Sequence, residues 1–175
     1  NYAELIQSNK TVLWLLRLSL IISFSSHVLL AIYLSFKNKL SNTVKYTDVE
    51  YYNSSFSSRT MLASGFIVVS FIIFHILHLT IGCIDSNLNI LFKEETKNIY
   101  EIVINSFKNK YVLVIYLFSL LSIFFHIKHG IFSFHQTLGI FNKKKNVESV
   151  SIFLSVIVVF FYIFIPISIA LNWIK

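Results

Sequence analysis

The residues best suited to chemistry in this chain are its histidines. The chain has six, and five of them lie inside long apolar runs: His27, His75, His78, His126 and His129. Polar side chains at membrane depth are costly and usually functional. An imidazole in hydrocarbon needs a partner, and the commonest partners are a metal ion or a haem iron. The positions of these histidines along the runs are therefore the main clue to function.

Four apolar runs must position the histidines. The composition is 55% hydrophobic and 13% charged, whereas a soluble domain has about a quarter charged residues. The runs cover roughly Thr11–Phe36, Met61–Cys83, Tyr111–Phe134 and Ser149–Ile174. Each is long enough to cross a hydrocarbon core ~30 Å thick at ~1.5 Å per residue. We expect an all-α, polytopic membrane helix bundle with four transmembrane helices, forming a single domain over residues 1–175.

A shorter amphipathic stretch lies between the second and third runs. In a helix over Asn98–Phe107, the residues Ile99, Ile102, Val103 and Phe107 would share one face. We predict a short interfacial helix here. An ordered loop fits the same residues equally well.

The charged residues indicate how the chain lies in a membrane. The net charge is +7, but the lysines are scattered through loops, which argues against nucleic acid and for contact with membrane lipid. The loop Lys37–Arg59 and the run Lys143–Lys145 are rich in basic residues, so we place both on the inner side. Four crossings then leave both ends of the chain on the outer side. The single cysteine, Cys83, excludes an internal disulfide.

The depths of the histidines suggest which of them can pair. His27 and His126 each lie about nine residues before the inner end of their runs, ~13 Å from it. His75 lies in the outer half of the second run and has no counterpart at its depth. A bis-histidine haem needs two imidazoles from different helices at one depth. His27 and His126 meet this requirement, and His75 would need a histidine from a further helix.

Several other residues are candidates for roles around such a site. Gly130 follows His126 by four residues on the same helical face, and Gly82 follows His75 by seven. Glycine lets a planar ligand approach a helix closely, although ordinary helix packing also favours it. Arg17 and Arg59 could pair with haem propionates or simply anchor the helix ends.

The remaining histidines have simpler interpretations. His75 with His78, and His126 with His129, form two H-x-x-H pairs, a spacing that zinc or di-iron sites also use. Di-iron bundles additionally need inward carboxylates, and the four predicted runs contain no Asp or Glu. We expect His78 and His129 to bond to a backbone carbonyl or a propionate. We expect His135 to lie at the membrane edge.

Two segments resemble a known family. The residues Ser58–Met61, Gly65 and FHILHLTIG (Phe74–Gly82), and then FHIKHGIFSFHQTLG (Phe125–Gly139), resemble helices of the single-polypeptide dihaem cytochrome b anchors of succinate dehydrogenase and fumarate reductase. The opening NYAELIQ and the last run with Pro166 also fit. The resemblance covers essentially the whole chain, and the Phe125–Gly139 motif is its most specific part.

The resemblance implies an electron-transfer role. A flavoprotein subunit would interconvert succinate and fumarate, and an iron–sulfur subunit would pass electrons to this anchor, its haem b and a quinone. His27 and His126 would hold the haem nearer the soluble subunits, and His75 one side of a second haem. The family's first helix, which carries a haem ligand, is absent from this sequence. That ligand would come from a preceding segment or a separate polypeptide, or the second haem would be lost.

The same resemblance leaves the quinone site and the membrane open. Ser58 and Arg59, polar groups at the inner membrane edge, are our candidates for quinone contacts. The expected location is a mitochondrial inner membrane or a bacterial cytoplasmic membrane. The anchor itself would transfer electrons and need not be catalytic. Two alternatives remain: a cytochrome b subunit of a hydrogenase or formate dehydrogenase, and a haem-free membrane scaffold or transporter.

Overall fold

The computed structural model describes residues 8–41, 55–84, 98–139 and 144–174. These residues are almost entirely helical and contain no strand, and four helices are long and apolar enough to cross a membrane. The all-α, multi-pass class predicted from the sequence is therefore confirmed. The chain divides into two compact units, Asn1–Tyr52 and Asn53–Lys175. Each is described by itself, and the expectation of one domain stays a prediction.

The first unit contributes one long helix, α2 (Lys10–Ser41). The side chain of Asn9 caps it by accepting a hydrogen bond from the Val12 backbone N–H at 3.1 Å. No residue of α2 is buried, and its hydropathy fits a membrane-spanning segment. His27 lies on this helix.

The second unit begins with a short helix that leads into a long one. α3 (Phe56–Arg59) is capped by the Ser55 hydroxyl, and α4 (Met61–His75) follows after Thr60. The chain then continues as a π-helical segment, η1 (Ile76–Ile81), which ends at Gly82. Gly82 adopts φ 73°, the left-handed conformation that glycine tolerates best. This glycine thus has a role in ending the helix that the sequence pattern did not suggest.

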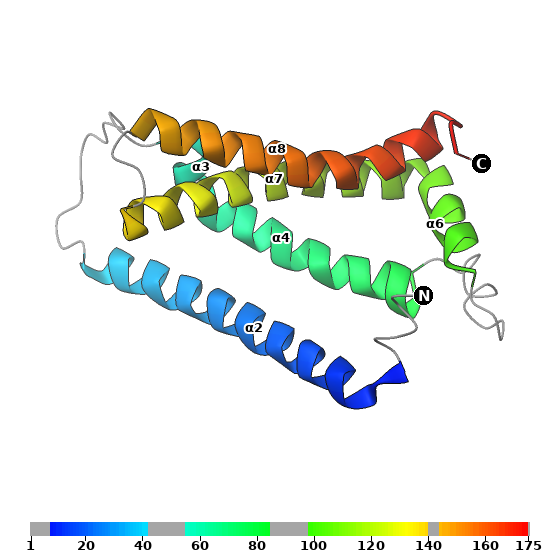
Figure 1. Ribbon diagram of the computed structural model, residues 1–175, viewed down its shortest axis with the longest axis horizontal. Helices are drawn as coiled ribbons and strands as arrows, with labels where there is room; N and C mark the ends of the chain where they lie inside the picture. The colour runs from blue at the N-terminus through cyan, green and yellow to red at the C-terminus, as the bar shows by residue number, and fades with distance from the viewer. Residues whose placement is uncertain (1–7, 42–54, 85–97, 140–143, 175) are drawn as a thin grey trace. The chain divides into compact units, whose positions relative to one another are not determined.

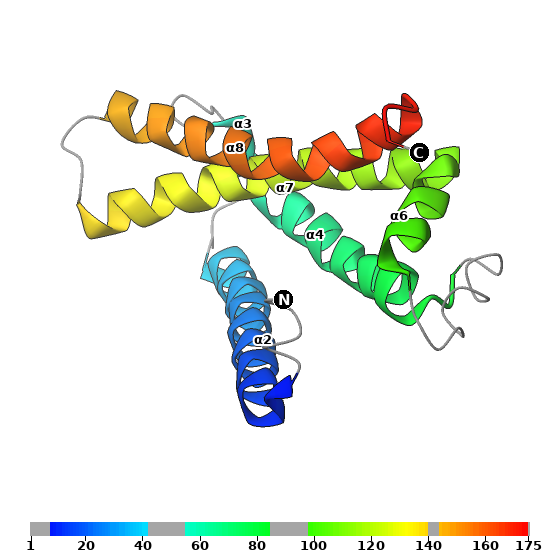
Figure 2. The same cartoon turned by 45° about the vertical axis from the view of Figure 1, so that its right-hand side comes forward.

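Two further long helices form an antiparallel hairpin. α7 (Lys110–Leu138) packs closely against α8 (Lys144–Ala170), as Figures 1 and 2 show. Every fourth residue from Val147 to Val159 on α8 is buried, and the two in between are serines, Ser151 and Ser155. Small residues at this spacing let two membrane helices approach closely. The Ser151 and Ser155 hydroxyls bond to backbone carbonyls one turn earlier, so their burial leaves no polar atom without a partner.

The predicted amphipathic helix is present as α6 (Ile99–Lys108). Asn98 caps it by accepting from the Glu101 N–H and donating to the Glu101 carboxylate. Its buried residues are Ile102, Ile104, Ser106 and Phe107. Ile99, which we expected on the buried face, is 71% exposed instead. The face is shifted because α6 packs against both α7 and α8 at the end where α8 finishes.

Two helices of the second unit are longer than the apolar runs predicted from the sequence. α7 continues past Phe134 to Leu138, and α8 begins at Lys144, five residues before the expected start. α8 runs through Pro166, and Figure 2 shows its axis changing direction in the orange-to-red part. The segment NYAELIQ and the loop charges Lys45, Asp85, Lys93, Glu94, Glu95, Lys97 and Lys143 lie outside the described residues.

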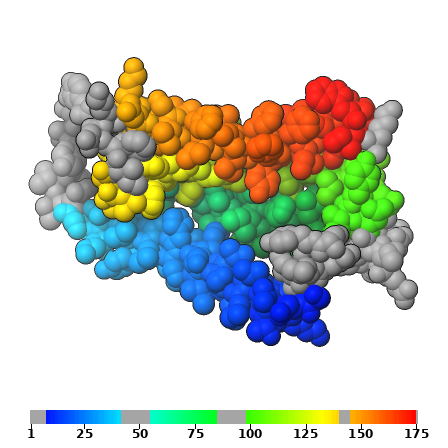
Figure 3. Space-filling view, in the orientation of Figure 1, coloured from blue at the N-terminus to red at the C-terminus, as the bar shows by residue number. Residues whose placement is uncertain are grey.

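The outer surface of the second unit is apolar. α8 forms a continuous band along the face shown in Figure 3. It exposes large side chains such as Phe153, Phe161 and Tyr162. Lipid tails are as apolar as these side chains, so the exposed residues fit a helix that faces a bilayer.

Candidate functional site

The four central histidines lie on two neighbouring helices of the second unit. α4 with its π-helical extension carries His75 and His78, and α7 carries His126 and His129. The two helices pack against each other. Across this interface the structure brings together two groups of residues, which we call the inner group (His126, Ser64 and Gly65) and the outer group (His75, His78 and Tyr116).

In the inner group, a serine of α4 holds a histidine of α7. The Ser64 Oγ lies 3.0 Å from the Met61 carbonyl and 3.3 Å from His126 Nδ1. Because a hydroxyl has only one proton, Ser64 donates to the carbonyl at the shorter distance and accepts from the Nδ1–H of His126. A neutral imidazole with its proton on Nδ1 has its lone pair on Nε2. In this arrangement a histidine can bind a metal through Nε2 rather than Nδ1.

Gly65 makes room for this imidazole. A Cβ added at Gly65 would lie 3.4 Å from His126 Cε1 and 3.8 Å from Nδ1. Glycine therefore allows the backbone of α4 to approach the ring of His126. At Gly130, by contrast, an added Cβ would have no described atom within 4 Å. The predicted close approach of a planar ligand at Gly130 has the space it needs and stays a prediction.

In the outer group, one tyrosine hydroxyl lies between two imidazoles. The Tyr116 hydroxyl oxygen lies 3.2 Å from His75 Nδ1 and 3.1 Å from His78 Nδ1. The tyrosine ring is 4% exposed. It lies edge-on to Phe71, Phe74 and Phe107. This aromatic cluster excludes other partners for the hydroxyl.

The single hydroxyl proton distinguishes the two histidines. When Tyr116 donates to one Nδ1, that imidazole carries its proton on Nε2 and cannot bind iron there. The other imidazole can donate its Nδ1–H to the phenol oxygen and keep a lone pair on Nε2. His78 is fully buried and stacks on Phe74, whereas His75 lines a cavity. His75 is therefore the histidine of this group that a molecule in the cavity could contact, and Tyr116 is a partner of His78 that the sequence did not predict.

The two groups lie at different depths. Tyr116 and His126 are ten residues apart on α7, which corresponds to ~15 Å along a helix axis. His75 and His126 are therefore too far apart along the helices to bind the same metal ion. This agrees with the prediction that the two histidines belong to separate sites.

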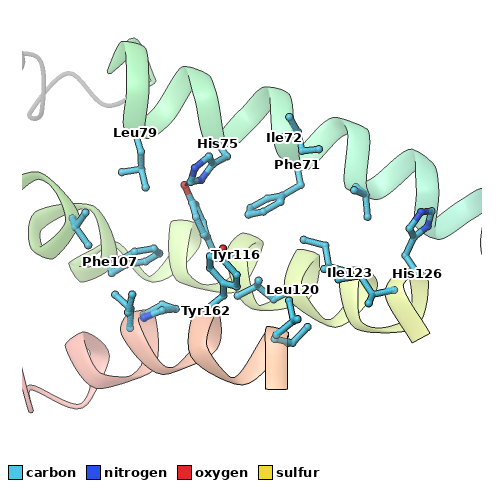
Figure 4. Close-up of a pocket in the computed structure, with 17 residues that line it drawn as sticks. Phe71, Ile72, His75, Leu79, Phe107, Tyr116, Leu120, Ile123, His126 and Tyr162 are labelled. Carbon is cyan, nitrogen blue, oxygen red and sulfur yellow. The ribbon is translucent and has the colours of Figure 1, made fainter. Parts of the chain in front are cut away.

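An apolar cavity of about 470 Å³ connects the levels of the two groups. Figure 4 shows His75 and His126 along its length, with Phe71 and Ile72 from α4, Leu120 and Ile123 from α7, and Tyr162 from α8. Cavities of ~300–1,000 Å³ with few polar groups are typical of cofactor sites. The cavity is thus suited to a large apolar ligand that contacts imidazoles.

No protein-family profile, curated protein or solved structure gave a significant match to this chain. The comparisons therefore neither support nor oppose the cytochrome b resemblance. The site is interpreted from its own geometry.

Charged residues lie close to the inner group. Lys128 Nζ of α7 lies 3.9 Å from Glu148 Oε1 of α8. Glu148 belongs to α8 because this helix starts five residues before the predicted run, and the run Ser149–Ile174 itself contains no carboxylate. Both side chains are partly exposed, and the pair links α7 to α8 one turn or less from His126 in the sequence of α7.

The candidates Ser58 and Arg59 are near the same level. They belong to α3, which packs against α7 with the rings of Phe56 and Phe125 5.3 Å apart. Phe125 directly precedes His126. The structure therefore places Ser58 and Arg59 toward the end of the bundle that holds the inner group, where a propionate or quinone contact was predicted.

Three histidines are not brought into either group: His27, His129 and His135. The expected bond of His129 to a backbone carbonyl or a propionate stays a prediction. His135 Nδ1 lies 2.8 Å from the Ile131 carbonyl one turn earlier, a local bond that fits its expected place at a helix end. His27 belongs to the other unit, so its pairing with His126 stays a prediction. Among the described residues, no three His, Cys, Asp or Glu side chains gather so as to hold a metal ion.

Proposed function

We propose that this chain is the haem b membrane anchor of a succinate:quinone oxidoreductase or fumarate reductase. It would carry electrons between an iron–sulfur subunit, itself joined to a flavoprotein subunit, and a quinone. The observation that carries the proposal is His126, which lies beside an apolar cavity and whose Nδ1 is bonded to Ser64, an arrangement in which a histidine binds iron through Nε2. The membrane would be a mitochondrial inner membrane or a bacterial cytoplasmic membrane.

The residues present fit a haem. The cavity has the apolar lining that a porphyrin needs, and Gly65 lets α4 come close to the ligand ring. Arg59 supplies positive charge near the level of His126, where propionates would need it. A metal transporter has less support, because the described residues form no cluster of three ligands.

The residues of the candidate site would have separate roles. His126, with His27 from α2, would hold the inner haem, and His75 would supply one ligand of an outer haem whose second ligand comes from another helix. A bound haem b supplies one-electron exchange between its ferrous and ferric states. Ser64 and Tyr116 would orient the imidazoles, and the apolar lining would exclude water. Ser58 and Arg59 remain the candidates for contact with the quinone.

The test is a reduced-minus-oxidised spectrum of the purified complex that contains this chain. We expect a low-spin b-type signal, whose inner component disappears in His27→Ala and in His126→Ala because each removes an axial ligand. The control is His129→Ala, on the same helix, which should keep the signal. An unchanged signal in both ligand variants would refute the pairing. Copurification with a flavoprotein that oxidises succinate would exclude the hydrogenase and formate dehydrogenase alternatives.

A further inference from the structure

We infer that Ser64 is a positioning residue that fixes the tautomer and the electron-donating strength of His126. The inference rests on the proposed haem function and goes beyond it, because it assigns a role to a hydroxyl that touches no cofactor. It starts from the bond between Ser64 Oγ and His126 Nδ1 at 3.3 Å, which crosses from α4 to α7.

The surroundings of Ser64 leave this bond few competitors. Ser64 is 5% exposed, so neither water nor lipid headgroups reach its hydroxyl freely. The hydroxyl proton goes to the Met61 carbonyl at 3.0 Å. The oxygen lone pairs then face His126, and a donor is the group that completes the hydroxyl's bonding. His126 is consequently kept with hydrogen on Nδ1.

The bond between Ser64 and His126 orients the His126 ring and adds little to the stability of α4. Serine in a membrane helix is already satisfied by its own backbone carbonyl, so α4 does not need the second bond for stability. Removing the hydroxyl leaves a backbone carbonyl that helical N–H groups still satisfy. His126 would lose the acceptor that orients its ring. We therefore assign to this bond the role of orienting the His126 ring.

Loss of the hydrogen bond should change the midpoint potential of the haem in one direction only. An acceptor on the distal N–H of a ligating histidine raises the basicity of the coordinating nitrogen. A more basic ligand stabilises ferric over ferrous iron. Loss of the Ser64 hydroxyl should therefore raise the midpoint potential of the haem that His126 holds. Such a shift separates a positioning role from a purely structural one.

The test is a redox titration of the purified complex, with low-spin haem signals followed by electron paramagnetic resonance. We expect Ser64→Ala to raise the midpoint potential of one haem and to change its g-values, while Ser64→Thr, which keeps a hydroxyl, stays close to the wild type. The matched control is Ser70→Ala, an exposed serine of the same helix, which should change neither.

The outcomes separate this inference from the proposed function. If the wild-type complex has no low-spin haem, the proposed function fails and this inference fails with it. If the haem is present but Ser64→Ala keeps the wild-type potential and g-values, only the role of Ser64 is refuted. A shift in Ser64→Thr as large as that in Ser64→Ala refutes it as well, because a retained hydroxyl should preserve the bond.

Discussion

Tyr116→Ala should be the most destabilising single substitution in the second unit. It removes a ring that is 4% exposed and packs edge-on against Phe71, Phe74 and Phe107. Truncating a buried aromatic residue costs about 3–5 kcal/mol. It also deprives His75 Nδ1 and His78 Nδ1 of the hydroxyl between them. The measurement is the free energy of unfolding in mixed micelles, followed by circular dichroism during a titration with denaturing detergent.

Tyr116→Phe isolates the hydroxyl from the ring. It should cost about 1–3 kcal/mol, because His78 is fully buried and would lose its bond at Nδ1. Tyr111→Ala, an 84% exposed tyrosine of the same helix, is the control and should change little. Equal stability of Tyr116→Phe and the wild type would show that the hydroxyl contributes nothing to the outer group.

Gly65→Leu should abolish the inner haem while leaving the helices folded. A Cβ at this position already lies 3.4 Å from the His126 ring, and the branched leucine side chain would displace the imidazole from its place beside Ser64. Leucine also favours helix more than glycine does, by about 0.8 kcal/mol, so α4 itself should not be weakened. The measurement is the haem content per complex, with circular dichroism to confirm helix content.

A graded series tests the same contact. In Gly65→Ala the added Cβ would be in van der Waals contact with the ring, 3.4 Å from Cε1, so this variant should retain most of the haem. Ala63→Leu adds similar bulk on an exposed position of the same helix and should retain all of it. Full haem content in Gly65→Leu would mean that the close approach of α4 to His126 has no functional importance.

The membrane-spanning helices could be predicted because hydropathy alone determines them. Long runs of Ile, Leu, Val and Phe leave few other options for a chain of this kind. The ends were less certain. The mostly polar residues Lys144–Glu148 begin α8, where Val147 is buried and Glu148 lies 3.9 Å from Lys128 of the neighbouring helix. A partner on another helix cannot be read from local composition.

The partners of the histidines were beyond the reach of sequence spacing. His75 and His126 stand out because imidazoles are rare in apolar runs, but Ser64 and Tyr116 look like ordinary members of such runs. Their roles depend on how α4 is rotated against α7, which is a property of packing. Gly65 has a role for the same reason. The π-helical segment after His75 also lacks a sequence signal, although such segments often mark functional sites.

Each of the helices α4 and α7 supplies a hydroxyl that bonds to a histidine of the other helix. Ser64 of α4 holds His126 of α7, and Tyr116 of α7 holds His75 of α4, ~15 Å further along. A piston-like slide of one helix past the other by a single turn, ~5.4 Å, would break both bonds at once. The two bonds therefore fix the register of α4 against α7 along the helix axis.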